Sequence, residues 1–120
     1  MKPEIRETHF GSITAGAEVY DHDILICLDG TVKKRKKKLS KAVYGTSHRI
    51  SLDEAEYVYE DGADLLLIGT GQTGMVELSP EAQAFFYQKH CQVELLRTPQ
   101  AVKRWNALDR PAIGLFHITC

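Results

Sequence analysis

The chain has 120 residues, 43% of them hydrophobic and 26% charged, proportions typical of one globular domain and not of a disordered or fibrous chain. Its formal net charge of −1 argues against binding nucleic acid or anionic membrane through overall charge. The charge is unevenly distributed, because seven of the fifteen basic residues lie in residues 33–41 and the rest of the chain carries 8 basic against 16 acidic side chains, a formal −8.

The cysteines and the N-terminal residues indicate a reducing compartment. Cys27, Cys91 and Cys120 are odd in number and cannot all pair within one chain. The first residues lack the apolar stretch of a signal peptide and are too acidic for a transit peptide. No apolar run approaches the ~20 residues that cross a bilayer. We therefore expect reduced thiols and a cytoplasmic location.

The first part of the chain predicts short strands joined by turns. Residues 5–15 mix apolar and polar side chains and predict two short strands or one bent edge strand. Residues 23–28 (DILICL) are almost continuously apolar, as expected of a strand covered on both faces. Asp29-Gly30 then indicates a tight turn, so residues 31–35 are predicted to return as a hairpin strand. The polar stretch 36–49 predicts a loop.

The remainder predicts alternating helices and strands. Ser51 followed three residues later by Glu54 has the pattern of a capping box, which predicts a helix that ends near Asp61-Gly62. Residues 64–68 (DLLLI) predict a second buried strand. The further elements are a helix from Ser79-Pro80 to about His90, a strand over 93–97, a helix from Thr98-Pro99 that bears Val102, Trp105 and Leu108, and a strand over 112–119.

This order of elements predicts a single α/β domain over residues 1–120. The back half follows a β-α-β-α-β order, which requires parallel pairing and covering helices. The front half follows a hairpin order, which requires antiparallel pairing. We therefore expect a mixed sheet.

A glycine loop (residues 69–74) spells G-x-G-x-x-G directly after the strand over 64–68. In a dinucleotide site the third glycine lies on the opening turn of the next helix. Here the helix begins only at Ser79-Pro80, so the spacing excludes a dinucleotide-binding site. Two hypotheses stay open: a turn that needs glycine at positive φ, or a small-ligand or anion site. The candidate residues of such a site are Gly69, Thr70, Gly71 and Gln72, with Arg35, His48 and His117 as neighbours.

A run of basic residues over 33–38, called the basic run below, gives the chain its charge asymmetry. On a strand its side chains would alternate between faces, and it contains no aromatic residue that could stack a base, so nucleic acid is disfavoured. One interpretation is an exposed strand end that lysines protect against edge pairing. The other is a docking surface for an acidic protein partner, formed by Lys33, Lys34, Arg35, Lys36, Lys37 and Lys38.

The histidines show no spacing typical of a metal site. His117 and Cys120 form an H-x-x-C, but two ligands are fewer than the three or four that zinc requires. The sequence therefore predicts no metal and no cofactor. His117 lies among apolar residues, as hydrogen-bonded core histidines do. Cys120 with a histidine base is the remaining enzymatic alternative, although no orienting third group is visible.

Several motifs together resemble one protein family. They are His9-Phe-Gly-Ser-Ile, Tyr20-Asp-His-Asp-Ile, Asp29-Gly-Thr-Val, Tyr44-Gly-Thr-Ser-His, Leu67-Ile-Gly-Thr-Gly-Gln-Thr-Gly, Thr98 through Trp105-Asn106, and Leu115-Phe-His-Ile-Thr-Cys. The chain is similar to a small domain-of-unknown-function family of archaea and bacteria. Its eukaryotic relatives include the mitochondrial respiratory complex I assembly factor 3 and an adipogenesis-associated protein.

The resemblance implies a three-layer β+α/β/α fold. Its central sheet would be mixed and five-stranded, with one strand antiparallel to the others, and an additional β layer would lie beside the helices. The resemblance implies no reaction, cofactor or catalytic residue.

Taken together, these observations favour a non-enzymatic protein-interaction or assembly-helper module. The alternatives are a small-ligand or anion-binding protein with its site at the glycine loop, and an enzyme of unknown reaction that uses His117 or Cys120. The sequence leaves a homodimer open.

Overall fold

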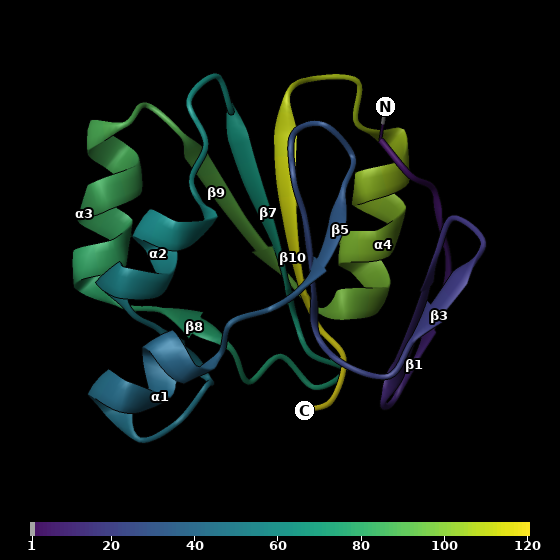
Figure 1. Cartoon of the computed structure of the whole chain (residues 1–120), viewed down its shortest axis with the longest axis horizontal. Coiled ribbons are helices and arrows are strands. Elements are labelled where there is room, and N and C mark those ends of the chain that lie inside the picture. The colour runs from purple at the N-terminus through teal and green to yellow at the C-terminus, as the bar shows by residue number, and fades with distance from the viewer. Residues whose placement is uncertain (1) are drawn as a thin grey trace.

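The computed structural model describes residues 2–120, and its elements are arranged in layers around one central sheet (Figure 1). In chain order the elements are β1 (Ile5–His9), β2 (Ser12–Ala15), β3 (Glu18–Tyr20), β4 (Ile24–Ile26), β5 (Val32–Lys34), α1 (Lys38–Tyr44), β6 (Arg49–Ile50), α2 (Leu52–Val58), β7 (Leu65–Thr70), β8 (Glu77–Leu78), α3 (Pro80–Gln88), β9 (Gln92–Leu96), α4 (Thr98–Ala107) and β10 (Ala112–His117).

The central sheet has the strand order β5-β4-β10-β7-β9. Strands β10, β7 and β9 are mutually parallel, whereas β4 is antiparallel to both β5 and β10. Strand β4 therefore opposes the other four strands, which confirms the predicted mixed sheet with one antiparallel strand. The chain steps from β7 outward to β9 and then back across β7 to β10. Because parallel crossovers are right-handed, these opposite steps place α3 and α4 on opposite faces.

Each face of the sheet is covered by a separate hydrophobic core. On one face α4 and the three-stranded sheet β1-β2-β3 pack over buried residues that include Ile5, Ile13, Trp105 and Phe116. The Trp105 and Phe116 rings meet edge to face with centroids 5.8 Å apart, a favoured aromatic geometry. On the other face α2 and α3 pack over a second core that includes Phe86. This arrangement confirms the three layers and the additional β layer (Figure 1).

The stretch predicted as a loop contains helix α1, which corrects the sequence interpretation of residues 36–49. The segment has no apolar stripe, so its periodicity gives no helix signal. The helix is instead held by polar contacts: the buried Ser40 hydroxyl donates to Glu54 of α2, and the Ser51 amide donates to Ser40 Oγ at 3.0 Å. It ends at Gly45, which adopts φ 72°, as helix C-termini commonly do.

Two predicted helix starts differ in their chemistry. The Ser51 hydroxyl accepts from the Glu54 amide at 3.1 Å as predicted, but the Glu54 carboxylate binds Arg35 and Ser40, so the capping box is only half formed. Helix α4 begins at Thr98 as predicted, yet no side chain caps it. The Thr98 hydroxyl donates instead to the carbonyl oxygen of His117 at 2.6 Å.

Other predicted strands and helices are present, with first and last residues that differ from those predicted. Strands β1 and β2 form the predicted hairpin, β4 and β5 pair across the predicted turn at Gly30, and α3 begins after Ser79. Strand β3 and the short parallel pair β6–β8 were not predicted. Cys27, Cys91 and Cys120 are all free thiols. Within residues 2–120, every helix is too short or too polar to cross a bilayer.

Candidate functional site at the carboxyl end of β10

A buried ion-pair network lies beneath the carboxyl end of β10. Arg35 Nε lies 2.7 Å from Glu54 Oε2, its Nη1 lies 3.0 Å from Asp23 Oδ2, and its Nη2 donates to the Ser47 carbonyl at 2.7 Å. The Arg35 side chain is 1% exposed. The basic run therefore does not present Arg35 to a partner or a ligand, which corrects the sequence interpretation. A rigid guanidinium fork between two carboxylates fixes the segment after β5 to α2.

Asp23 joins this network to the end of β10. Its Oδ2 lies 2.7 Å from His117 Nδ1, and its Oδ1 accepts from the Ile118 amide at 3.0 Å. Burial alone would raise the pKa of Asp23, but the hydrogen bond and charge of His117, the Ile118 amide and the charge of Arg35 lower this pKa to about 2. The buried carboxylate is thus ionised and holds the His117 ring in one orientation.

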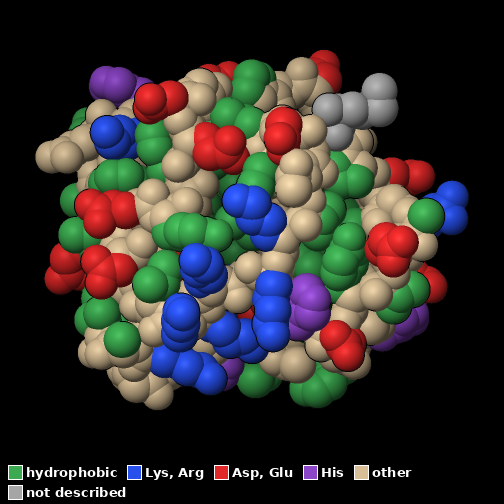
Figure 2. All heavy atoms as spheres, viewed as in Figure 1, with side chains coloured by type: hydrophobic (Ala, Val, Ile, Leu, Met, Phe, Trp, Pro, Cys, Tyr) green, Lys and Arg blue, Asp and Glu red, His purple; other side chains and the backbone are tan. Residues whose placement is uncertain are grey.

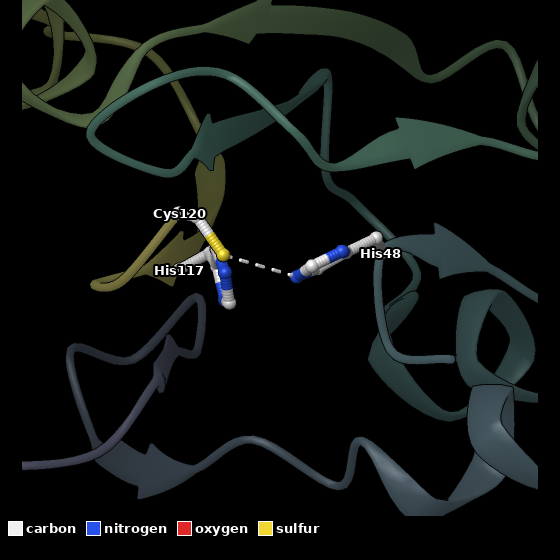
Figure 3. Close-up of side chains that lie close together, drawn as sticks. All are labelled: His48, His117 and Cys120. Atoms are coloured by element: carbon white, nitrogen blue, oxygen red, sulfur yellow. Dashed lines mark hydrogen bonds between the residues drawn. The ribbon is translucent and has the colours of Figure 1, made fainter. Parts of the chain in front are cut away.

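His117 is part of a cluster with His48 and Cys120 (Figure 3). His48 Nε2 lies 3.5 Å from Cys120 Sγ, and the two imidazole rings meet edge to face with centroids 5.3 Å apart. One ligand atom from each of the three side chains falls within 4.8 Å of the others. His117 is buried, whereas His48 and Cys120 are half-buried. Sulfur and imidazole nitrogen are donors that soft and borderline metals prefer.

The backbone around His48 is fixed by β8. The His48 carbonyl accepts from the Glu77 amide at 2.7 Å, directly before the β6–β8 pairing. Strand β8 follows the glycine loop, and within that loop a Cβ atom on Gly71 would come 2.9 Å from His117 Cδ2.

Backbone amides of the glycine loop and of Met75 after it hold residues 117–120, either directly or through Thr98. The Gly71 amide donates to Thr98 Oγ1 at 2.9 Å, the Gln72 amide to the Thr119 carbonyl at 2.7 Å, and the Met75 amide to the Cys120 carbonyl at 3.0 Å. The Thr70 hydroxyl donates to the Leu96 carbonyl at 3.1 Å. The three amides therefore position the end of the chain that carries His117 and Cys120.

Two glycines of the loop have the positive φ of the turn hypothesis, since Gly71 has φ 108° and Gly74 has φ 77°. Gly69 lies within β7, where a Cβ atom would come 2.9 Å from the Phe116 ring. Glycine here permits close packing and sharp turns.

A basic pocket of about 330 Å³ opens beside the buried network. Its walls carry Lys34 of β5, Lys37, and Lys41 of α1, and the pocket is also lined by Asp21, His22, Asp23, Ile118 and Thr119. Figure 2 shows Lys and Arg side chains gathered on this face, over β5, the turn after it and α1. Lys33 instead lines a different pocket with Cys27 and Glu60, because successive side chains of a strand point to opposite faces.

Sequence reasoning missed Asp23, Glu54 and Thr119 as parts of this region. Asp23 resembles an ordinary polar residue at a strand start, and Glu54 a capping residue, so neither has a signal that links it to Arg35 or His117. The expectation of no metal rested on only two ligands, His117 and Cys120. The structure adds His48 as a third ligand, from a segment 69 positions earlier in sequence than His117. The number of ligands is therefore no longer an argument against a metal.

Residues 5–115 match the model of a family described as a protein of unknown function (DUF498/DUF598). The chain belongs to this family. The sequence resemblance is thereby confirmed.

Solved structures agree with this DUF498/DUF598 assignment. The crystal structure of conserved hypothetical protein PH1505 from Pyrococcus horikoshii OT3 is 33% identical, with a TM-score of 0.92 over 98% of this chain and 99% of that one. The protein MT938 is 30% identical, with a TM-score of 0.84 over 99% and 100% of the two chains. A Mth938-like domain from Bordetella pertussis, solved by NMR, is 17% identical, with a TM-score of 0.62 over 97% and 85%. The last likeness supports the fold alone.

Proposed function

We propose that this DUF498/DUF598 domain is a protein-interaction module that binds an acidic segment of a partner at the basic pocket. The proposal rests on lysines whose charge the domain itself leaves unpaired. Among residues 2–120, no carboxylate forms an ion pair with Lys33, Lys34, Lys36, Lys38 or Lys41. Lys37 alone approaches one, with Nζ 3.9 Å from Asp23 Oδ2.

The charge of the whole chain supports an oriented encounter. Residues outside 33–41 carry a formal −8, so an acidic partner is attracted to the basic pocket and repelled elsewhere. Such a distribution steers association and fixes the orientation of the partner more than it raises affinity.

Exposed apolar side chains favour a protein partner over nucleic acid. Val43 of α1 is 54% exposed, and Leu52 and Tyr57 of α2 are each 37% exposed. Apolar groups on the two helices beside the basic run suit a peptide that combines acidic and apolar residues. Lys36 Nζ lies 4.6 Å from the centroid of the Tyr57 ring, so a base that stacked on this face of the ring would have to displace the lysine.

The buried arginine makes this surface rigid. Arg35 lies between Lys34 and Lys36 and ties the run to α2 and to Asp23. Lysines on a preorganised backbone lose less conformational entropy when a partner binds.

The test compares two doubly charge-reversed variants. Lys34→Glu/Lys41→Glu removes the exposed lysines of the basic pocket, and Arg6→Glu/Lys103→Glu changes the total charge equally at exposed positions elsewhere. The probe is a fluorescein-labelled peptide of alternating glutamate and leucine, measured by fluorescence anisotropy. We expect the pocket variant to bind roughly tenfold more weakly than the unaltered protein, and the control variant to bind nearly as tightly.

A competition experiment addresses nucleic acid. Unlabelled single-stranded RNA of mixed sequence should displace the peptide less effectively than the unlabelled peptide does. Tighter binding of RNA, or an equal loss in the control variant, would overturn the proposal.

A further inference from the structure

We propose that His48, His117 and Cys120 form a binding site for Zn²⁺, with two imidazole nitrogens and one thiolate as protein ligands. This site does not depend on the docking function proposed above, because none of its ligands is a lysine of the basic pocket. The two sites are neighbours, since Asp23 and Thr119 line the pocket and also contact His117.

The distances between donors match a zinc site. Tetrahedral zinc with Zn–N near 2.0–2.1 Å and Zn–S near 2.3 Å separates nitrogen from sulfur by about 3.6 Å. His48 Nε2 and Cys120 Sγ are 3.5 Å apart. All three donor atoms lie within 4.8 Å of one another, so the widest pair must shorten by at most about 1.5 Å to bind an ion. Rotation of the half-buried His48 and Cys120 side chains can provide that movement.

Asp23 provides the outer contact that zinc-bound histidines ordinarily make. Its carboxylate accepts from His117 Nδ1 at 2.7 Å, which leaves the Nε2 lone pair of His117 for the metal. Thr119 Oγ1 lies 3.2 Å from that Nε2 and is the group that zinc would displace. A carboxylate on the remote ring nitrogen fixes the tautomer and increases the basicity of the ligand.

The surroundings give an ion both a path and a vacant coordination position. His48 lines a surface pocket of about 360 Å³ together with Tyr44, Thr46, Arg49, Met75 and Glu77. Three protein ligands leave the fourth position to water or to an anionic ligand that enters through this pocket. The two nitrogens and one sulfur exclude Mg²⁺ and Ca²⁺, which require oxygen ligands.

The ligands come from segments that the fold holds together. Residues 117–120 are bound by the Gln72 and Met75 amides, and His48 is bound by the Glu77 amide. One loop and the strand after it therefore position all three ligands, which reduces the ordering that metal binding must accomplish.

The first experiment titrates the full chain with Zn²⁺ by isothermal calorimetry and with Co²⁺ by absorption spectroscopy. We expect one ion per chain and a thiolate-to-cobalt charge-transfer band. Cys120→Ser and His48→Ala should lose the site, with circular dichroism confirming that both variants fold. The matched control His9→Ala/Cys27→Ser removes the same residue types outside the cluster and should still bind the metal.

A second measurement needs no variant. Iodoacetamide should alkylate Cys120 more slowly with Zn²⁺ than with Mg²⁺, while Cys27 in the same molecule reacts at an unchanged rate, as read by mass spectrometry. Equal Cys120 alkylation with both ions, or loss of the cobalt band in the control variant, would overturn the proposal. The Lys34→Glu/Lys41→Glu variant should bind Zn²⁺ normally, so failure of the zinc site and failure of the docking function are distinguishable.

Discussion

The imidazole of His117 and the carboxylate of Asp23 are joined by a 2.7 Å contact between Nδ1 and Oδ2. This contact connects the last residue of β10 to the residue directly before β4, its antiparallel neighbour. It lies between the buried Arg35 network and the His48–His117–Cys120 cluster, so its chemistry affects the stability of the fold as well as the cluster.

Acid should destabilise the protein through Asp23. Its pKa in the folded state is about 2, below the ordinary 3.8, so its contribution is fully present above about pH 4 and is lost as the pH falls toward about 2. We expect the free energy of unfolding to lose about 2 kcal/mol from this group. Urea denaturation of the unaltered protein and of Asp23→Asn, at several pH values in this range, measures the loss. The difference in free energy of unfolding between the two proteins should become smaller as the pH falls. A difference that stays constant would contradict the lowered pKa of Asp23.

Replacement of Arg35 by methionine should be severely destabilising. It leaves the carboxylates of Asp23 and Glu54 buried without their cation, and breaking a buried pair costs about 3–5 kcal/mol. The matched control is Arg104→Met, which removes an equally well-aligned contact to Glu94 at the surface. Exposed pairs contribute little, so equal destabilisation of both variants in chemical denaturation would refute this view of Arg35.

Alanine at Gly71 should disturb the region around the cluster. Its backbone has φ 108°, and a Cβ atom would lie 2.4 Å from the Cys120 carbonyl carbon and 2.9 Å from His117 Cδ2. Gly16→Ala is the control, because Gly16 also has positive φ but has no atom within 4 Å of the added carbon. Backbone strain of roughly 1–2 kcal/mol applies to alanine at Gly16, and the strain at Gly71 is at least as large because its φ lies beyond the left-handed helical region. Thermal melts should therefore show a clearly larger loss for Gly71→Ala.

Replacement of the two serine N-caps by alanine should destabilise the protein by different amounts. Ser79 accepts one amide hydrogen bond, from Ala82 at 3.2 Å, so Ser79→Ala should cost about 1 kcal/mol. Ser51 accepts from the Glu54 amide and also donates to the Leu39 carbonyl at 2.9 Å. Ser51→Ala should therefore cost about 2 kcal/mol, since a second buried hydrogen bond is lost. A Ser51→Ala loss no greater than that of Ser79→Ala would show that the contact to α1 adds nothing.

The layered fold was predictable because its signals are local. Residues 64–68 and 23–28 are apolar runs short enough to be buried strands, and Ser79-Pro80 indicates where a helix begins. Helix α1 was missed because its stability comes from the contacts of Ser40 with Glu54 and Ser51, which lie elsewhere in the sequence.

The candidate site was predictable only in part. The glycine loop, His48 and His117 were expected to converge, and the structure does bring His48 and His117 together. The same structure shows that the loop amides bind the chain itself. A basic run gives no indication that Arg35 alone turns inward, because the difference between it and its lysine neighbours depends on where Asp23 and Glu54 lie.

By itself, the sequence determined the order of the elements, the mixed sheet and the charge asymmetry, since periodicity, turn residues and net charge act along the chain. The tertiary structure alone decided which polar groups meet. The 2.7 Å contact of His117 with Asp23 and the approach of Cys120 to His48 join residues 94 and 72 positions apart. Such contacts depend on strand order and on the loop that holds residues 117–120, and no local pattern encodes them.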